Sequence, residues 1–464
     1  MLWAGIGGED RNVRQLSHPG LEEVFIRGIA AVLPFVAAFI SGIFVVYKIF
    51  TRSPAYLSLW SPLGLTVAYG LVGIFSSFQS PNGWVSIYWS ASYLAVPAVL
   101  LSVAWGQAGL ERVGKWLMGT WAMLMFAAMV LFILAFLRLD FESSFSNPLT
   151  LWGCGDIGSW YVESSGGIRS TGVGRYAALA ALLSVSGLWW RGWRIPAVII
   201  LVCSLTLLLS TGARTAIFGL IVAAPLVIVL YGGKKAAIGM ALAAVVLIPL
   251  GLTTGFHKPF SACLFHGGGS HNVEPRVVVF GELVKRTPKP EPGSASSESG
   301  LPSTDPALVP AKSEEETILA LEQDVGDFFS MTGRTTFWSE GLSLYKNSPI
   351  IGRGFHADRL LIGDHIHNAY IHSLLQTGTI GGLAFMAALV LAWILLVRLL
   401  LHLRSITGLD RAILIHVTGL AAFFAVRTIP ESTGAFFSID WLILAPMLLY
   451  IQLLHQKYFG KAEK

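Results

Sequence analysis

Apolar runs of about 20 residues recur along most of this sequence, and they constrain its fold more than any other feature. As helices, segments of this length cross a hydrocarbon layer of roughly 30 Å, where every backbone polar group needs a partner within the protein. The composition agrees, since 54% of the 464 residues are hydrophobic and only 13% are charged. A soluble protein needs more polar surface than this. The sequence therefore predicts an all-α, polytopic membrane protein.

About eleven transmembrane helices can be placed, and a twelfth is possible. The predicted spans are residues 28–47, 57–78, 84–105, 116–137, 175–190, 195–212, 214–231, 235–254, 379–400, 410–428 and 436–454. This divides the chain into a polar N-terminal segment (1–27), a first membrane region (28–254), a long polar segment (255–378), a second membrane region (379–454) and a tail (455–464).

The positions of Lys and Arg orient these helices, because short cytoplasmic loops carry both residues in excess. Alternate loops contain Lys48 and Arg52, Arg112 and Lys115, Arg191 and Arg194, Lys234 and Lys235, and Arg398, Arg404 and Arg411. The tail is then cytoplasmic, while the N-terminus and segment 255–378 face the opposite, external side. The first 27 residues lack the layout of a signal peptide. This cytoplasmic bias accounts for most of the net charge of +5, so no nucleic-acid partner is expected.

The long external segment, residues 255–378, has two parts. Residues 285–316 are rich in Pro, Ser, Glu and Lys, which predicts a disordered insertion. Residues 317–378 place apolar side chains at helical spacing, which predicts amphipathic helices on the membrane domain, including one from His365 into Leu375.

Two of the three cysteines, Cys154 and Cys263, fall in loops that we place on the same external face. They either pair as a disulfide or remain unrelated free thiols, and the sequence favours neither. Cys203 lies in an apolar run, where packing explains it.

Charged and imidazole groups gather in the last part of the external segment, beside the bilayer. They are Arg334, Arg353, His356, Asp358, Arg359, Asp364, His365, His367 and His372. Such groups are costly near a membrane and often mark function. For Asp358, Arg359 and Asp364, a solvated surface is an equally good interpretation.

His367 stands out by its setting, because His367-Asn368 is followed after nine residues by Gly378, then by Gly381 and Gly382 and an apolar span. This spacing puts an imidazole at the external water boundary, ahead of glycines that allow close helix packing. A neutral imidazole there can act as a general base near pH 7. A purely structural role is the alternative.

Three histidines close in sequence also raise the question of a metal site. If the stretch is helical, His365 and His372 share a face while His367 points about 140° away, at about 100° per residue. This geometry argues against one metal ion bound by all three, so no metal and no other cofactor is predicted.

A lone arginine, Arg214, sits at the external end of two apolar runs, within the stretch Ser210-Thr211-Gly212-Ala213-Arg214-Thr215. It is either a helix-end anchor that reaches the lipid headgroups or a ligand for a diphosphate, whose oxygens suit the planar guanidinium. Arg334 and Arg353 are further candidates for the second role.

Three stretches together resemble the O-antigen ligase and polymerase family of bacterial envelope polysaccharide assembly. They are STGARTA at 210–216, GRTTFWSEGLSLYKNSPIIGRGF at 333–355 and HNAYIHSLLQTGTIGG at 367–382. The spacing after His367 is similar to that of the ligase branch. The order of the spans and the place of the long loop are also similar.

This resemblance implies an inner-membrane glycosyltransferase of the helical type C architecture, with its active site facing the periplasm. It implies a glycan donor linked to undecaprenyl diphosphate, a lipid A core acceptor, inversion at the anomeric carbon, and no metal. By motif, His367 is the expected base and Arg214 and Arg334 the expected catalytic arginines around the diphosphate. The expected substrate-binding residues are Arg353, Asn368, Arg276, His365 and Tyr370.

Two points in this resemblance leave alternatives open. The insertion at 285–316 lengthens the gap between Arg214 and Arg334, which makes Arg276 a rival for the second arginine role. A polymerase would share the donor but use a second lipid-linked repeat unit as acceptor. A transporter or flippase without covalent chemistry is a third hypothesis, against which stand the lack of internal repeats and of charged residues buried in the middle of the spans.

Overall fold

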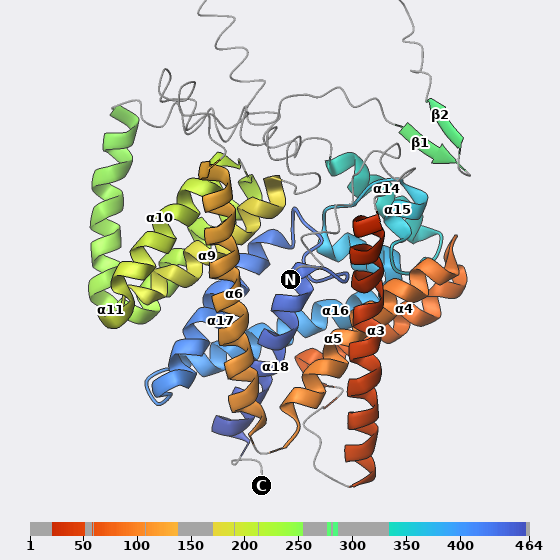
Figure 1. The fold of residues 1–464 in the computed structure, drawn as a ribbon, viewed down its shortest axis with the longest axis horizontal. Helices are drawn as coiled ribbons and strands as arrows, with labels where there is room; N and C mark the ends of the chain where they lie inside the picture. The colour runs from red at the N-terminus through yellow and green to blue at the C-terminus, as the bar shows by residue number, and fades with distance from the viewer. Residues whose placement is uncertain are drawn as a thin grey trace, which may run out of the picture.

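The computed structural model describes residues 21–51, 58, 60–106, 108–137, 170–189, 191–211, 213–253, 276–279, 282–285 and 334–460, and Figure 1 shows their arrangement. The α-helices are α3 (Leu21–Phe50), α4 (Pro62–Ser76), α5 (Gly83–Ala104), α6 (Gly109–Leu137), α9 (Ser170–Gly187), α10 (Arg194–Ser210), α11 (Arg214–Thr253), α14 (Arg334–Lys346), α15 (Ala357–Leu361), α16 (Ala369–Leu401), α17 (Gly408–Arg427) and α18 (Ile439–Phe459). Short 3-10 turns, η1 (Ser77–Gln79) and η2 (Arg191–Trp193), adjoin α4 and α10.

The helical membrane architecture is confirmed. Among the described residues, seven helices are long and apolar enough to cross a membrane: α4 with η1, α5, α6, α11, α16, α17 and α18. Each predicted apolar run coincides with a described helix or with part of one. The count of eleven or twelve spans stays a prediction. One local feature was not predicted: Arg276–Val279 (β1) and Glu282–Lys285 (β2) pair as an antiparallel hairpin, whereas the sequence predicted an all-α protein.

Two glycines divide long helices where the sequence predicted boundaries. Gly233 has φ 60° and ψ −152°, which separates the predicted spans 214–231 and 235–254 within α11. Gly378 has φ 62° and ψ −164°, so α16 bends just before the span predicted from 379. Both are positive-φ conformations that glycine adopts without strain.

The N-terminal end of α16 corrects one expectation. The helix begins at Ala369, whereas we predicted helix from His365. Asn368 ends the extended connection, since its side chain accepts hydrogen bonds from the backbone N–H groups of Tyr370 and Ile371, both at 3.0 Å. An N-cap residue has non-helical backbone angles, so it stops the helix from continuing toward His365.

Helix α18 lies at the centre of the bundle (Figure 1) and is largely buried along its length. Its Trp441 ring stacks on Tyr93 of α5 at 4.2 Å between centroids. Tyr69 of α4 contacts Phe355, before α15, and Phe385 of α16, both at 5.2 Å. These aromatic contacts anchor the chain between α14 and α15 on the membrane helices.

Helices α14 and α15 pack on α16 and lie at the end of the bundle opposite the C-terminus (Figure 1). All but the first residue of the insertion predicted at 285–316 lies outside the described residues, as do the pair Cys154 and Cys263 and residues 317–333.

Candidate active site

His367 lies between α15 and α16 with φ 51°, a left-handed conformation that is uncommon for a residue with a side chain. The connection between α17 and α18 holds the two residues that follow it. Asn368 Nδ2 donates to the carbonyl of Ile429 at 3.0 Å, and the N–H of Ala369 donates to the carbonyl of Thr428 at 2.9 Å. The imidazole itself is 28% exposed. These bonds fix the strained residue while its ring stays accessible to solvent.

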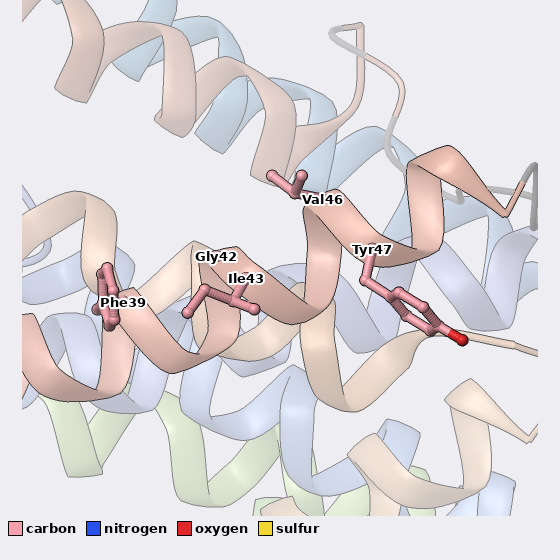
Figure 2. Close-up of a pocket in the computed structure, with 5 residues that line it drawn as sticks. All are labelled: Phe39, Gly42, Ile43, Val46 and Tyr47. Carbon is pink, nitrogen blue, oxygen red and sulfur yellow. The ribbon is translucent and has the colours of Figure 1, made fainter.

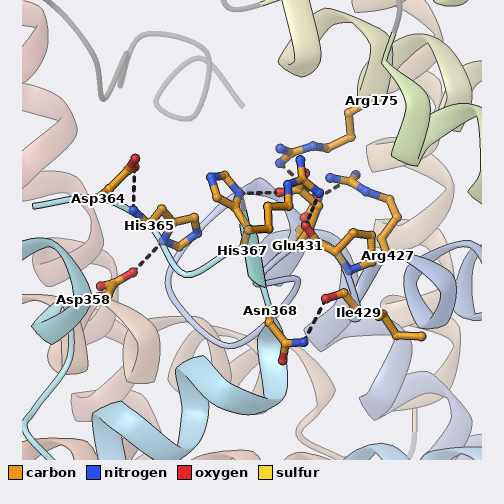
Figure 3. Close-up of polar contacts among 12 residues, drawn as sticks. Arg175, Asp358, Asp364, His365, His367, Asn368, Arg427, Ile429 and Glu431 are labelled. Carbon is orange, nitrogen blue, oxygen red and sulfur yellow. Dashed lines mark hydrogen bonds and ion pairs between the residues drawn. The ribbon is translucent and has the colours of Figure 1, made fainter. Parts of the chain in front are cut away.

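Glu431 joins the two predicted catalytic residues of the external segment. His367 Nδ1 lies 3.3 Å from its Oε2, a contact drawn in Figure 3, and Arg334 Nη2 lies 3.4 Å from its Oε1. Arg334 Nη1 also donates to the carbonyl of Pro430 at 2.7 Å. The structure thus brings His367 and Arg334 together through a carboxylate that sequence reasoning missed.

Glu431 is ionised in this setting. Burial by itself would raise its pKa, but the hydrogen bond with His367 and the positive charges of Arg427 and Arg334 outweigh burial and lower the pKa to about 2. An ionised carboxylate accepts from His367 Nδ1–H and favours the tautomer with a lone pair on Nε2.

Arg214, the first residue of α11, comes from the membrane helices. It lies close enough to Arg334 for their positive charges to interact. The sequence prediction that a membrane-helix arginine and an external-segment arginine share one site agrees with this arrangement.

Two further arginines lie behind this group, and Figure 3 shows both near Glu431. Arg175 of α9 and Arg427 of α17 share Asp440 of α18, with Nη1–Oδ1 distances of 3.3 and 3.8 Å. Arg427 is 2% exposed, and its Nε has no hydrogen-bond partner among the described residues. A buried donor without a partner is costly, so Arg427 adds positive charge that the fold leaves only partly compensated.

Sequence reasoning missed Arg175, Arg427, Glu431 and Asp440 altogether. Their position in the sequence could have identified them, because each lies at or near the external end of a predicted span. Ionisable groups at membrane depth are costly and commonly functional, and these four residues met that criterion as well as Arg214 did.

The expected substrate-binding residues fall into different places. Asn368 caps α16, and Tyr370 OH lies 3.1 Å from Thr428 Oγ1, so both adjoin His367. Arg353 donates its backbone N–H to the carbonyl of Leu375, and no hydrogen bond or ion pair within the described chain joins it to His367. Arg276 lies in β1, and its side chain is outside what the structure describes.

His365 belongs to a separate cluster beside His367. Its Nδ1 lies 2.7 Å from Asp358 Oδ2, and its ring is 4.9 Å from that of His367. Asp358 is 0% exposed, so the interpretation as a solvated surface is wrong for this residue. Asp364 is exposed and accepts the backbone N–H of His365 at 2.7 Å, and Figure 3 shows all three carboxyl and imidazole groups.

Two apolar pockets flank the helices. One follows a single helix, α3, and Figure 2 shows its lining: Phe39, Gly42, Ile43, Val46 and Tyr47. Its lining contains no acidic, basic or histidine side chain. The other, about 250 Å³, lies between α16, α17 and α18, and Tyr370 and Thr428 line it together with apolar side chains. This second pocket is the one that adjoins His367.

Residues 199–386 match the model of a family described as O-antigen ligase. This match confirms the resemblance to the O-antigen ligase family. The matched stretch contains Arg214, Arg334 and His367, and it ends before Arg427 and Glu431. Members of this family are membrane enzymes, which agrees with the helices described above. No curated protein matches the chain in a sequence comparison.

Proposed function

We propose that the protein is an O-antigen ligase of the bacterial inner membrane. It transfers a polysaccharide from undecaprenyl diphosphate to a hydroxyl of lipid A core at the periplasmic face, with inversion and without a metal in the chemistry. The observation that carries this proposal is the contact of His367 and Arg334 with Glu431, beside Arg214, within the stretch that matches the family.

His367 supplies the base. With Nδ1–H donated to Glu431, its Nε2 lone pair accepts the proton of the acceptor hydroxyl as that oxygen attacks the anomeric carbon. The new bond forms between the acceptor oxygen and this carbon while the bond from the carbon to the diphosphate oxygen breaks. Glu431 holds the imidazole in position and stabilises the imidazolium that results.

Arg214 and Arg334 stabilise the leaving diphosphate. A guanidinium has five N–H donors, and two nitrogens of Arg334 are occupied by Pro430 and Glu431. Its remaining donors are available to phosphate oxygens, and Arg214 adds a second positive charge nearby. Fixed positive charge is most effective where negative charge develops. Two like charges held this close, as Arg214 and Arg334 are, favour an anionic ligand between them.

The apolar pocket between α16, α17 and α18 supports a substrate with a hydrocarbon chain. Tyr370 and Thr428 lie where its lining meets the His367 connection, and the rest of the lining is apolar. A lipid-linked diphosphate needs this combination of positive charge and an adjoining apolar surface.

The decisive experiment supplies purified protein with lipid-linked glycan and lipid A core, and measures core-linked product. His367→Ala should abolish transfer but keep binding of the lipid-linked donor. His402→Ala is the matched control, because His402 is exposed at the far end of α16. Retained transfer in His367→Ala would remove the base role, and lengthened lipid-linked chains without core-linked product would identify a polymerase instead.

The arginines are tested in the same assay. Arg214→Gln or Arg334→Gln should lower the rate, the affinity for the donor, or both, while Arg398→Gln, in the last turn of α16, should not. An unchanged rate and affinity would remove that arginine from the diphosphate site.

A further inference from the structure

The cluster of Asp358, His365 and His372 lies next to the proposed active site but takes no part in the proposed transfer. One atom from each residue lies within 4.8 Å of the others. The residues come from three places: α15, the connection after it, and α16. His365 and His372, which helical spacing would place on one face, do lie together here. The third member of the cluster is Asp358 and not His367.

The distances fit a small, closely coordinated ion. Asp358 Oδ2 lies 2.7 Å from His365 Nδ1, and Asp358 Oδ1 lies 3.6 Å from His372 Nε2. A tetrahedral ion with bonds of about 2.0–2.1 Å to nitrogen and oxygen separates neighbouring ligand atoms by about 3.3 Å. The two observed distances lie on either side of that value but involve different oxygens of Asp358. Bound to one ion, the three ligand atoms, which lie within 4.8 Å of one another, would move closer together.

The burial of the cluster is the second, independent observation. Asp358 is 0% exposed and His372 is 2% exposed. Asp358 Oδ1 and His372 Nδ1 have no hydrogen-bond partner among the described residues, while His372 Nε2 also contacts the side chain of Gln376. A buried carboxylate oxygen without a partner is costly, and a bound cation would compensate it.

The chemistry of the donor set also suits such an ion. One aspartate carboxylate with two imidazoles is a set that binds zinc and related divalent ions.

We propose that Asp358, His365 and His372 form a binding site for a divalent transition-metal ion of the zinc type. The ion would tie α15 and α16 to the connection between them, which carries the strained residue His367. Its role is structural: it positions His367, and it would bind whether or not the protein transfers a glycan. A fourth ligand would come from solvent.

The test uses the full chain in detergent, purified with a tag that contains no histidine, stripped with EDTA and then titrated with Zn²⁺. Metal content per chain, the dissociation constant and the thermal unfolding temperature are measured. Cys154, Cys203 and Cys263 are replaced by Ser in the parent chain, since thiolates also bind zinc. Co²⁺ is then added as a spectroscopic probe of four-coordinate geometry.

The parent chain should bind one Zn²⁺ and unfold at a higher temperature with it. His365→Gln, at a partly exposed position, should raise the dissociation constant by more than about 100-fold, because even residues that only support a ligand cost 10- to 100-fold. Asp358→Asn should have the same effect. His402→Gln, at an exposed histidine elsewhere, should bind Zn²⁺ like the parent.

Three results would overturn the proposal: no stoichiometric Zn²⁺ in the parent chain, unchanged affinity in His365→Gln, or an equal loss in His402→Gln. The first of these would leave Asp358 as a hydrogen-bond acceptor for the two imidazoles. If the parent chain binds Zn²⁺ as expected but transfers no glycan to lipid A core, the metal site is upheld and only the proposed function is contradicted.

Discussion

Replacing Glu431 with Gln removes one negative charge at the point where His367 and Arg334 meet, with little change in shape. The contact with His367 spans 3.3 Å at a partly exposed site. A hydrogen bond to a charged group is worth about 1.5–3 kcal/mol, and about 1.4 kcal/mol changes a rate tenfold. We therefore expect kcat for transfer to fall about 10- to 100-fold.

The assay is the transfer of lipid-linked glycan to lipid A core, measured as a function of donor concentration to separate kcat from KM. Glu340→Gln is the matched control, because Glu340 is exposed on α14 at the same end of the bundle. Unfolding temperatures of both variants are measured in detergent to separate catalysis from folding. An unchanged kcat in a folded Glu431→Gln variant would refute the proposed role of Glu431 in holding the base.

The same substitution has a consequence for stability that depends on pH. The pKa of Glu431 is about 2 in the folded protein against an ordinary 4.5. Its charge therefore contributes up to about 3 kcal/mol to folding. Because the folded-state pKa is the lower one, this contribution is present above about pH 4.5 and is lost as pH falls toward 2. The unfolding temperatures of the parent and Glu431→Gln should thus differ most near neutral pH and converge in acid; a constant difference would contradict the ionised state.

Two further substitutions test how the structure presents His367. Asn368→Ala removes the cap of α16 and the bond to the Ile429 carbonyl, and should destabilise the protein by about 1–2 kcal/mol, seen as a lower unfolding temperature; no change would show that the cap is dispensable. Gly378→Ala forces a side chain onto a positive-φ residue and places its Cβ 2.3 Å from the backbone of Ile350. We therefore expect the free energy of unfolding to fall by about 3 kcal/mol or more, seen again as a lower unfolding temperature. The control is Gly363→Ala, which also has positive φ but open space around it and should cost less.

Much of the fold was predictable because hydrophobic burial in a bilayer is a local property of the sequence. Each predicted apolar run coincides with a described helix, and the helix breaks at Gly233 and Gly378 fall at predicted boundaries. The start of α16 was predicted too early, since apolar spacing does not reveal which side chain caps the helix. The hairpin of β1 and β2 was missed for a similar reason, because four-residue strands carry little periodic signal.

By itself, the sequence determined the class of protein, the general position of its chemistry, and His367, Arg214 and Arg334 as its leading candidates. Only the tertiary structure decided their partners. Glu431 lies 64 residues from His367 along the chain, and Asp440 lies 265 residues from Arg175. Contacts at such separations depend on how the helices pack, which no local pattern specifies. The same packing buries Asp358 and brings it to His365 and His372. Spacing along the chain considered only the three histidines, and it argued against one ion bound by all of them.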